Sequence, residues 1–253
     1  MHPILFELEI AGRPVLIAAY GLCALVGALA GVGLTYRRLI RQGADWMDGV
    51  SILGVAFPMG VLGALLFGFA YRLLDRAALA GPGAELHLVW QGGVALGVPA
   101  AAVMARRLGR PILDVLDAGA PGLMLGLACG RVGCLLGGCC FGAPTALPWG
   151  IRYPAGHPTC ALYPGQAVHP APVYEAVLCL AIVAGALAAG TPRRRGAVLA
   201  GSLLAYAAGR VLLEFVRGDH DPALLGLTAP QLFSLAVAAA VLATWRLLPR
   251  RAG

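Results

Sequence analysis

The sequence has little charge, and it has no lysine at all. Charged residues make up 12% of its 253 residues and hydrophobic residues 59%, and the mean hydropathy is +0.80. About a quarter of the residues of a typical soluble domain are charged, so this composition excludes an ordinary cytosolic globular protein. The net charge of +7 is the excess of 19 basic residues over 12 acidic ones. All the basic residues are arginine, in short clusters between apolar runs. We interpret these clusters as signals of membrane topology and expect no nucleic-acid partner.

Internal repeats, a soluble appendage and a low-complexity linker are also missing from the sequence. The first apolar run is long enough to cross a bilayer, and no small-residue cleavage site follows it. We therefore expect a retained helix and not a signal peptide. A transporter would show paired broken helices in two related halves, and the sequence has no such repeat. The sequence thus predicts a single integral membrane domain over residues 1–253.

The sequence is dominated by long apolar runs. The hydrocarbon core of a bilayer is about 30 Å thick and needs about 20 apolar residues per helix. The runs predict an all-α, polytopic membrane protein with about seven transmembrane helices. The predicted segments are Val15–Tyr36, Gly49–Phe69, Leu88–Ala105, Ile112–Cys129, Pro172–Gly190, Ala197–Val216 and Ala229–Leu247.

Loops rich in arginine alternate along the chain with loops that have few. Because positively charged loops face the cytoplasm, this pattern predicts an N-terminus outside and a C-terminus in the cytoplasm. All five histidines then fall outside, so we expect any proton-transfer chemistry at the outward face. The predicted cytoplasmic arginines are Arg37, Arg38, Arg41, Arg106, Arg107, Arg110, Arg193, Arg194, Arg195, Arg246, Arg250 and Arg251.

One long outer connection, predicted over residues 130–170, is rich in glycine, proline and cysteine. This composition favours a folded loop that packs on the helices and roofs a cavity. Cys139 and Cys140 are adjacent and cannot easily bond to each other, so their options are metal ligation or pairing with Cys134 or Cys160. The sequence leaves the disulfide pattern open. Since no CxxC pair with a matching partner is present, we expect no obligatory metal and no cofactor.

A polar stripe marks the sixth predicted helix. Tyr206, Arg210, Glu214 and Arg217 fall within about 80° of arc at 100° per residue. Charges within a membrane span usually face an interior site. Two arginines near one carboxylate leave positive charge uncompensated, which suits a phosphate group. The alternative is a structural pair of Arg210 and Glu214 that locks neighbouring helices.

The segment HPAPVYEA (residues 169–176) leads into the fifth predicted helix from outside. Its prolines favour an extended entry, and Glu175 falls one turn into the membrane interface. His169 could act as a general base or as a helix cap.

Taken in order, these motifs resemble those of the bacterial prolipoprotein diacylglyceryl transferases. GRVGCLLGGCCFG (130–142) resembles the signature G-R-x-G-N-F-x-N-x-E-x-x-G, HPAPVYEA resembles H-P-x-Q-x-Y-E, and YAAGRVLLEFVR (206–217) resembles Y-x-x-x-R-x-x-x-E-x-x-R. Shorter matches are Tyr20-Gly21, a W-x-G-G turn at Trp90, Gly92 and Gly93, and a Q-x-x-S at Gln231 and Ser234. The resemblance covers nearly the whole chain.

The resemblance implies transfer of a diacylglyceryl group from phosphatidylglycerol to the lipobox cysteine thiol in the signal peptide of a prolipoprotein, within the bacterial inner membrane. It implies that Arg131, Arg210 and Arg217 serve the phosphate, that Glu214 orients arginine, and that Tyr20 and Tyr206 bond the lipid headgroup. The catalytic candidates are Arg131, Arg210, Glu214, Tyr20 and His169. The substrate-binding candidates are Arg217, Tyr206, Gly130, Gly133, Cys134, Gly92, Gly93, Tyr174, Glu175 and Gln231.

The chain departs from the family pattern at several positions. Cys134 and Gly137 replace the two asparagines of the signature, and Cys139 replaces its glutamate. Gly97 stands where the family usually has a histidine after W-x-G-G. Either His169 or Glu214 then serves as the base, or the chain is a divergent paralogue with another acceptor or thiol chemistry. A non-enzymatic lipid-binding membrane protein of the same fold is the remaining alternative.

Overall fold

The computed structural model of this chain describes residues 4–10, 13–74, 89–154, 162–217, 222–224 and 226–250. The chain forms two compact units, one of residues 1–33 and 120–253 and the other of residues 34–119. Two long helices, α1 and α5, contribute to both units.

The described part of the chain is mainly helical, which confirms the predicted all-α, polytopic membrane protein. Among the described residues, six helices are long and apolar enough to cross a membrane, and the described part of the third predicted span, α4 (Trp90–Arg107), is not one of the six. The six are α1 (Ala19–Arg41), α2 (Trp46–Leu74), α5 (Ile112–Gly137), α7 (Ala171–Ala188), α8 (Ala197–Glu214) and α9 (Ala229–Thr244). A short 3-10 turn, η1 (Trp245–Leu247), follows α9.

Several predicted ends differ from the observed ones, and two of these differences change an element. The first helix begins at Ala19, because β2 (Arg13–Ala18) pairs antiparallel with β1 (Ile4–Ile10). The alternating β-branched residues of this segment suit a strand better than a helix. The outer loop begins at Gly138 and not at Gly130, because α5 continues to Gly137. Gly138 has a φ of +75°, which glycine adopts without strain, and the helix ends there.

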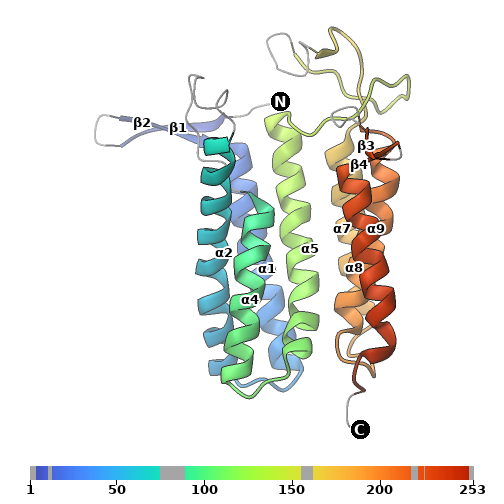
Figure 1. Cartoon of the computed structure of the whole chain (residues 1–253). Coiled ribbons are helices and arrows are strands. Elements are labelled where there is room, and N and C mark those ends of the chain that lie inside the picture. The colour runs from blue at the N-terminus through green and yellow to red at the C-terminus, as the bar shows by residue number, and fades with distance from the viewer. Residues whose placement is uncertain are drawn as a thin grey trace. The chain divides into compact units, whose positions relative to one another are not determined.

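In the unit of residues 34–119, α2 and α4 lie side by side (Figure 1). Glycines line their contact: a Cβ at Gly92 would lie 2.6 Å from Cβ of Phe67, and a Cβ at Gly93 would lie 3.3 Å from the carbonyl oxygen of Gly60. Small residues let membrane helices approach this closely. Gly92 and Gly93, expected at a substrate site, therefore have a packing role in this unit.

In the other unit, α8 lies between α7 and α9 (Figure 1). The first half of α1 packs against the second half of α5, where a Cβ at Gly27 would lie 2.6 Å from Cβ of Cys129. A second hairpin, β3 (Pro222–Leu224) and β4 (Leu227–Thr228), connects α8 to α9. These elements bring together the polar residues of the candidate site.

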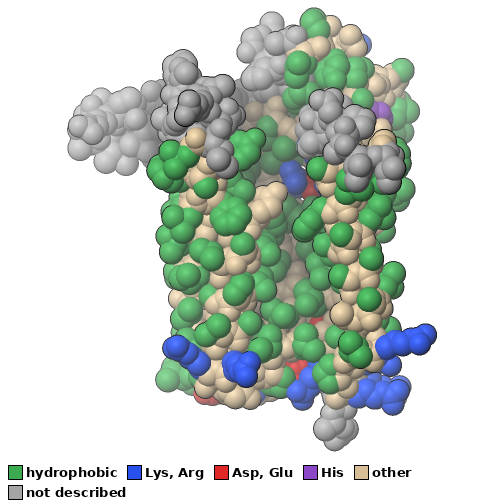
Figure 2. All heavy atoms as spheres, in the orientation of Figure 1, with side chains coloured by type: hydrophobic (Ala, Val, Ile, Leu, Met, Phe, Trp, Pro, Cys, Tyr) green, Lys and Arg blue, Asp and Glu red, His purple; other side chains and the backbone are tan. Residues whose placement is uncertain are grey.

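The helix flanks present apolar side chains, and arginines gather at helix ends (Figure 2). Large hydrophobic residues such as Leu66, Leu212 and Phe233 are at least half exposed. Exposed apolar side chains on long apolar helices are what contact with lipid requires. The arrangement agrees with a multi-pass membrane protein.

Candidate active site

Glu175, one turn into α7, is the centre of the polar site. Its side chain is 1% exposed, and both carboxylate oxygens have partners. Oε1 accepts a hydrogen bond from the Tyr206 hydroxyl at 2.7 Å and lies 3.0 Å from Nη2 of Arg131. Oε2 lies 3.9 Å from Nη1 of Arg217. One buried carboxylate thus joins side chains from α5, α8 and the segment after α8.

A second buried carboxylate, Glu214, lies at the end of α8. Its Oε2 is 2.6 Å from Nη1 of Arg210, and its Oε1 accepts a hydrogen bond from the Thr228 hydroxyl at 2.8 Å. Thr228 precedes α9, and its backbone N–H donates to Oε1 of Gln231 at 3.0 Å. The amide of Gln231 also donates to the carbonyl oxygen of Val211. Gln231, a substrate-binding candidate, thus makes its described contacts within the protein.

The polar stripe predicted on the sixth helix provides contacts to both buried carboxylates, Glu175 and Glu214. Tyr206 and Arg217 contact Glu175, whereas Arg210 contacts Glu214 on its own helix. The predicted helix extends through Val216, but α8 ends at Glu214. Arg217 therefore lies beyond the helix, where its backbone forms an isolated bridge with Gly142. Helical periodicity predicted the polar stripe. It did not predict that Glu175 is the partner of Tyr206 and Arg217.

Gly142 is the last residue of the GRVGCLLGGCCFG segment, and backbone hydrogen bonds at this position hold the outer loop against the site. Its backbone N–H donates to the carbonyl oxygen of His169 at 2.9 Å, and the N–H of Ala143 donates to that of Val216. A Cβ at Gly142 would clash with the Val216 carbonyl oxygen and would lie 2.6 Å from Cβ of His169. Only glycine fits at this crossing of three segments.

Gly142→Ala is therefore expected to destabilise the protein by about 1–3 kcal/mol, the usual cost of an overpacked position. Gly130→Ala is the control, because a Cβ at Gly130 in α5 meets nothing within 4 Å. Thermal unfolding in detergent measures both. Equal melting temperatures for the two variants would contradict the close approach at Gly142.

His169 lies at the outer entry of α7. Its Nδ1 is 3.3 Å from the Tyr174 hydroxyl, which also accepts a hydrogen bond from Nε1 of Trp149 at 2.7 Å. The N-cap of α7 is Pro170, with no side-chain cap bond, so the expectation that His169 caps the helix is wrong. A proton could pass between the imidazole and the Tyr174 hydroxyl.

Three thiols gather where α5 ends. The sulfur atoms of Cys134, Cys139 and Cys140 all lie within 4.8 Å of one another. Nη1 of Arg131 lies 3.9 Å from Sγ of Cys134 and 3.6 Å from Sγ of Cys140. The pKa of Cys140 lies far below its usual value because the thiols of Cys134 and Cys139 hydrogen-bond to it and Arg131 adds positive charge. Hydrogen bonds with the Cys134 and Cys140 thiols raise the pKa of Cys139.

Further candidates lie on the first helix, on α5 and outside the described residues. Gly133 faces α1, where its missing Cβ makes room for Tyr20: a Cβ there would lie 3.1 Å from Cα of that tyrosine. Cys160, a predicted disulfide partner, lies outside the described residues.

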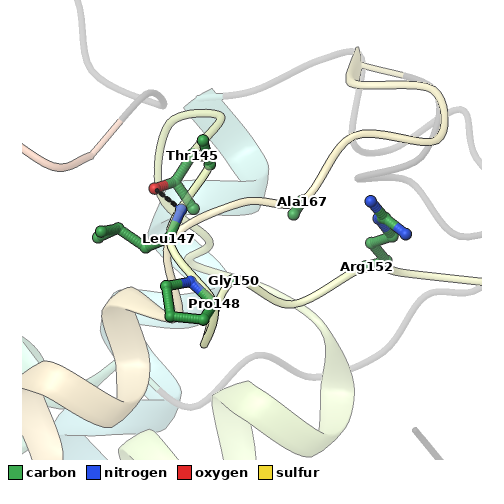
Figure 3. Close-up of a pocket in the computed structure, with 7 residues that line it drawn as sticks. Thr145, Leu147, Pro148, Gly150, Arg152 and Ala167 are labelled. Carbon is green, nitrogen blue, oxygen red and sulfur yellow. Dashed lines mark hydrogen bonds between the residues drawn. The ribbon is translucent and has the colours of Figure 1, made fainter.

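The outer loop holds a cavity of about 530 Å³. Figure 3 shows the hydroxyl of Thr145 turned toward the backbone N–H of Leu147, to which it is hydrogen bonded at 3.2 Å. Arg152 supplies the charge in the lining. The lining residues are Thr145, Ala146, Leu147, Pro148, Gly150, Arg152 and Ala167.

Two residues of the site were missing from the sequence prediction. Thr228 could have been found, because T-A-P-Q at 228–231 has the S/T-x-x-Q spacing of a capping box. Trp149 had no such signal, because its partner Tyr174 lies 25 positions away in the sequence.

Apolar helices that enclose linked arginines and carboxylates define a polytopic membrane protein with a polar site at one end of its helices. The chain belongs to the prolipoprotein diacylglyceryl transferase family, whose model matches residues 3–247. A relative from Paenarthrobacter aurescens (strain TC1), named phosphatidylglycerol--prolipoprotein diacylglyceryl transferase, is 33% identical over 264 residues, covering 94% of this chain and 80% of the relative. One of the same name from Nitratidesulfovibrio vulgaris is 34% identical over 238 residues, covering 88% and 84%.

Proposed function

We propose that this protein transfers the diacylglyceryl group of phosphatidylglycerol to the cysteine thiol of a prolipoprotein lipobox. The observation that carries the proposal is the pair of guanidinium groups, Arg131 and Arg217, held around the buried Glu175. The described contacts bring two guanidinium groups to the same buried carboxylate, and a guanidinium binds phosphate oxygens bidentately. Membership of the transferase family supports the same reading.

In the proposed reaction, the thiolate sulfur attacks the glyceryl carbon that carries the phosphate. A thioether forms, the carbon–oxygen bond breaks, and glycerol phosphate leaves with the electron pair. Arg131, Arg210 and Arg217 stabilise the charge that develops on the leaving phosphate. Arg210 lies one helical turn after Tyr206 on α8. Glu175 and Glu214 orient these arginines, and the Tyr206 hydroxyl fixes the Glu175 carboxylate at 2.7 Å.

The acceptor must lose its thiol proton, because the thiolate is the nucleophile. His169 is the proposed base: its Nδ1 contacts Tyr174, and its backbone is fixed by Gly142 and Ala143. Glu214 is less suited, because both of its oxygens are already engaged, by Arg210 and Thr228.

The proposal is tested with purified protein, phosphatidylglycerol radiolabelled in its acyl chains, and a lipobox peptide. Label is expected to move to the peptide, and a matched peptide with serine in place of the lipobox cysteine is expected to remain unlabelled. Folded protein that binds phosphatidylglycerol but labels neither peptide would support the lipid-binding alternative.

We also propose an inner-membrane location with the site facing outward. A cysteine introduced at Arg194 should then react with a membrane-impermeant thiol reagent only from the cytoplasmic side. One at Leu147, an exposed residue of the outer loop, should react only from outside. Both are placed in a Cys139→Ser background, because Cys139 is itself exposed. Gly156, which the predicted topology places on the outer side, is not among the described residues. Labelling at Leu147 from the cytoplasmic side alone would overturn this orientation.

A further inference from the structure

The three thiols at the end of α5 have no role in the phosphate chemistry proposed above, although Arg131 of that site contacts two of them. Cys134 lies on the last turns of the helix, and the chain then folds back, so that the N–H of Cys139 donates to the carbonyl oxygen of Cys134 at 3.0 Å. Cys140 has a φ of +61°, a backbone conformation that is costly for a residue other than glycine. The turn after α5 thus holds these three sulfur atoms close together.

The sulfur geometry is close to that of a metal-thiolate site. A zinc–sulfur bond of about 2.3 Å places tetrahedral ligand sulfurs about 3.8 Å apart. The three sulfurs here lie within 4.8 Å of one another, so small side-chain rotations bring all three onto one ion. Thiolates select thiophilic cations over Mg²⁺ or Ca²⁺. No fourth histidine, cysteine or carboxylate joins this group among residues 4–10, 13–74, 89–154, 162–217, 222–224 and 226–250.

We propose that Cys134, Cys139 and Cys140 bind one divalent, thiophilic metal ion of the zinc class, whose fourth position receives a thiol. Sites with three protein ligands and one open position are the arrangement of catalytic zinc, whereas structural zinc sites have four protein ligands. This replaces the expectation from sequence that no metal is needed, which rested on the lack of paired CxxC motifs.

Arg131 supports a metal-thiolate site more than a disulfide. Three thiolates and one divalent ion carry one net negative charge, and the guanidinium that approaches Cys134 and Cys140 offsets it. Hydrogen bonds from neighbouring residues to metal ligands commonly orient them in this way. A disulfide would use two of the three sulfurs and would leave the guanidinium facing uncharged sulfur.

The role of the fourth position rests on the proposed function. A thiol that coordinates the ion is deprotonated, so the acceptor cysteine would release its proton to solvent or to His169 and remain as a thiolate. Its sulfur then forms the bond to the glyceryl carbon as the carbon–oxygen bond to phosphate breaks. No oxidant or reductant is needed. The metal would thus hold the acceptor cysteine as its thiolate, in a chain whose signature has cysteines where the family has asparagine and glutamate.

The test is a titration of the full-length, reduced, metal-free protein in detergent with Co²⁺, a spectroscopic substitute for Zn²⁺. One equivalent of Co²⁺ should produce thiolate-to-cobalt charge-transfer absorption. Cys139→Ser and Cys140→Ser should each lose this absorption. Cys129→Ser is the matched control, because it removes a thiol of α5 that lies outside the cluster, and it should behave as the parent.

A lipobox peptide added to the cobalt protein should then shift the visible bands, and the peptide with serine in place of cysteine should not. Absence of cobalt binding by the parent protein, equal binding by Cys139→Ser and Cys129→Ser, or isolation of the protein with two of the three sulfurs in a disulfide would overturn the metal site.

These readouts are independent of lipid transfer. A protein that binds cobalt but transfers no lipid would thus refute the proposed function alone, and a metal-free protein with full transfer would refute the metal's role alone.

Discussion

Glu175→Gln is expected to lower diacylglyceryl transfer by about 100-fold while the protein still binds phosphatidylglycerol. Glutamine keeps the shape of the side chain but removes the charge that holds Arg131 at 3.0 Å and Arg217 at 3.9 Å. The local positive charge rises, so the anionic headgroup is still attracted. The guanidinium groups lose their common anchor, and fixed donors stabilise a transition state far better than donors that must first reorganise. We therefore expect a fall in kcat with KM little changed.

Asp48→Asn is the matched control for this variant. Asp48 is also paired with an arginine, Arg110, at 2.7 Å, but both belong to the unit of residues 34–119. Transfer should remain at the parental rate. Because loss of a buried charge can affect folding, Tyr206→Phe provides a milder change that removes only the hydrogen bond to Glu175. If Glu175→Gln and Asp48→Asn have equal kcat, the Glu175 cluster has no part in the reaction.

Arg210→Ala is expected to weaken phosphatidylglycerol binding by about 10- to 150-fold with a smaller effect on stability. A charged hydrogen bond to a phosphate contributes about 1.5–3 kcal/mol. The fold should survive because Glu214 keeps the hydrogen bond from Thr228 at 2.8 Å, so its carboxylate is not left without a partner. Lipid binding and melting temperature, measured on the same detergent-solubilised sample, separate the two effects.

Glu214→Ala is the complement to that variant. It leaves Arg210 charged but without its 2.6 Å partner, so some lipid binding should remain while turnover is lost. An Arg210→Ala variant that binds and turns over lipid like the parent would mean that the Arg210–Glu214 pair is a structural lock between helices.

Local patterns in the sequence predicted the helices well because each apolar run is a property of adjacent residues. The predicted span Ala197–Val216 ends two residues from the observed end of α8 at Glu214. Where the pattern was ambiguous, the prediction failed. The glycine- and cysteine-rich stretch after Cys129 predicts a loop, but α5 continues to Gly137. Glycine is tolerated in membrane helices because the backbone must remain hydrogen bonded there.

The site was only partly predictable because its decisive contacts are distant in sequence. Arg210 and Glu214 are one helical turn apart, and spacing alone identified them. Arg131 precedes Glu175 by 44 positions, and Arg217 follows it by 42, so no periodicity links them. The thiol cluster depends on the turn at Gly138 and the left-handed backbone of Cys140, which the sequence does not reveal.

The central claim is that the bond broken lies between the glyceryl carbon and the phosphate oxygen. Phosphatidylglycerol labelled in its headgroup glycerol tests it most directly, with purified protein and a lipobox peptide. We expect one water-soluble glycerol phosphate for each thioether found on the peptide cysteine, and neither product with the peptide that has serine in its place. Headgroup label on the peptide, or glycerol phosphate released without a thioether, would contradict the claim.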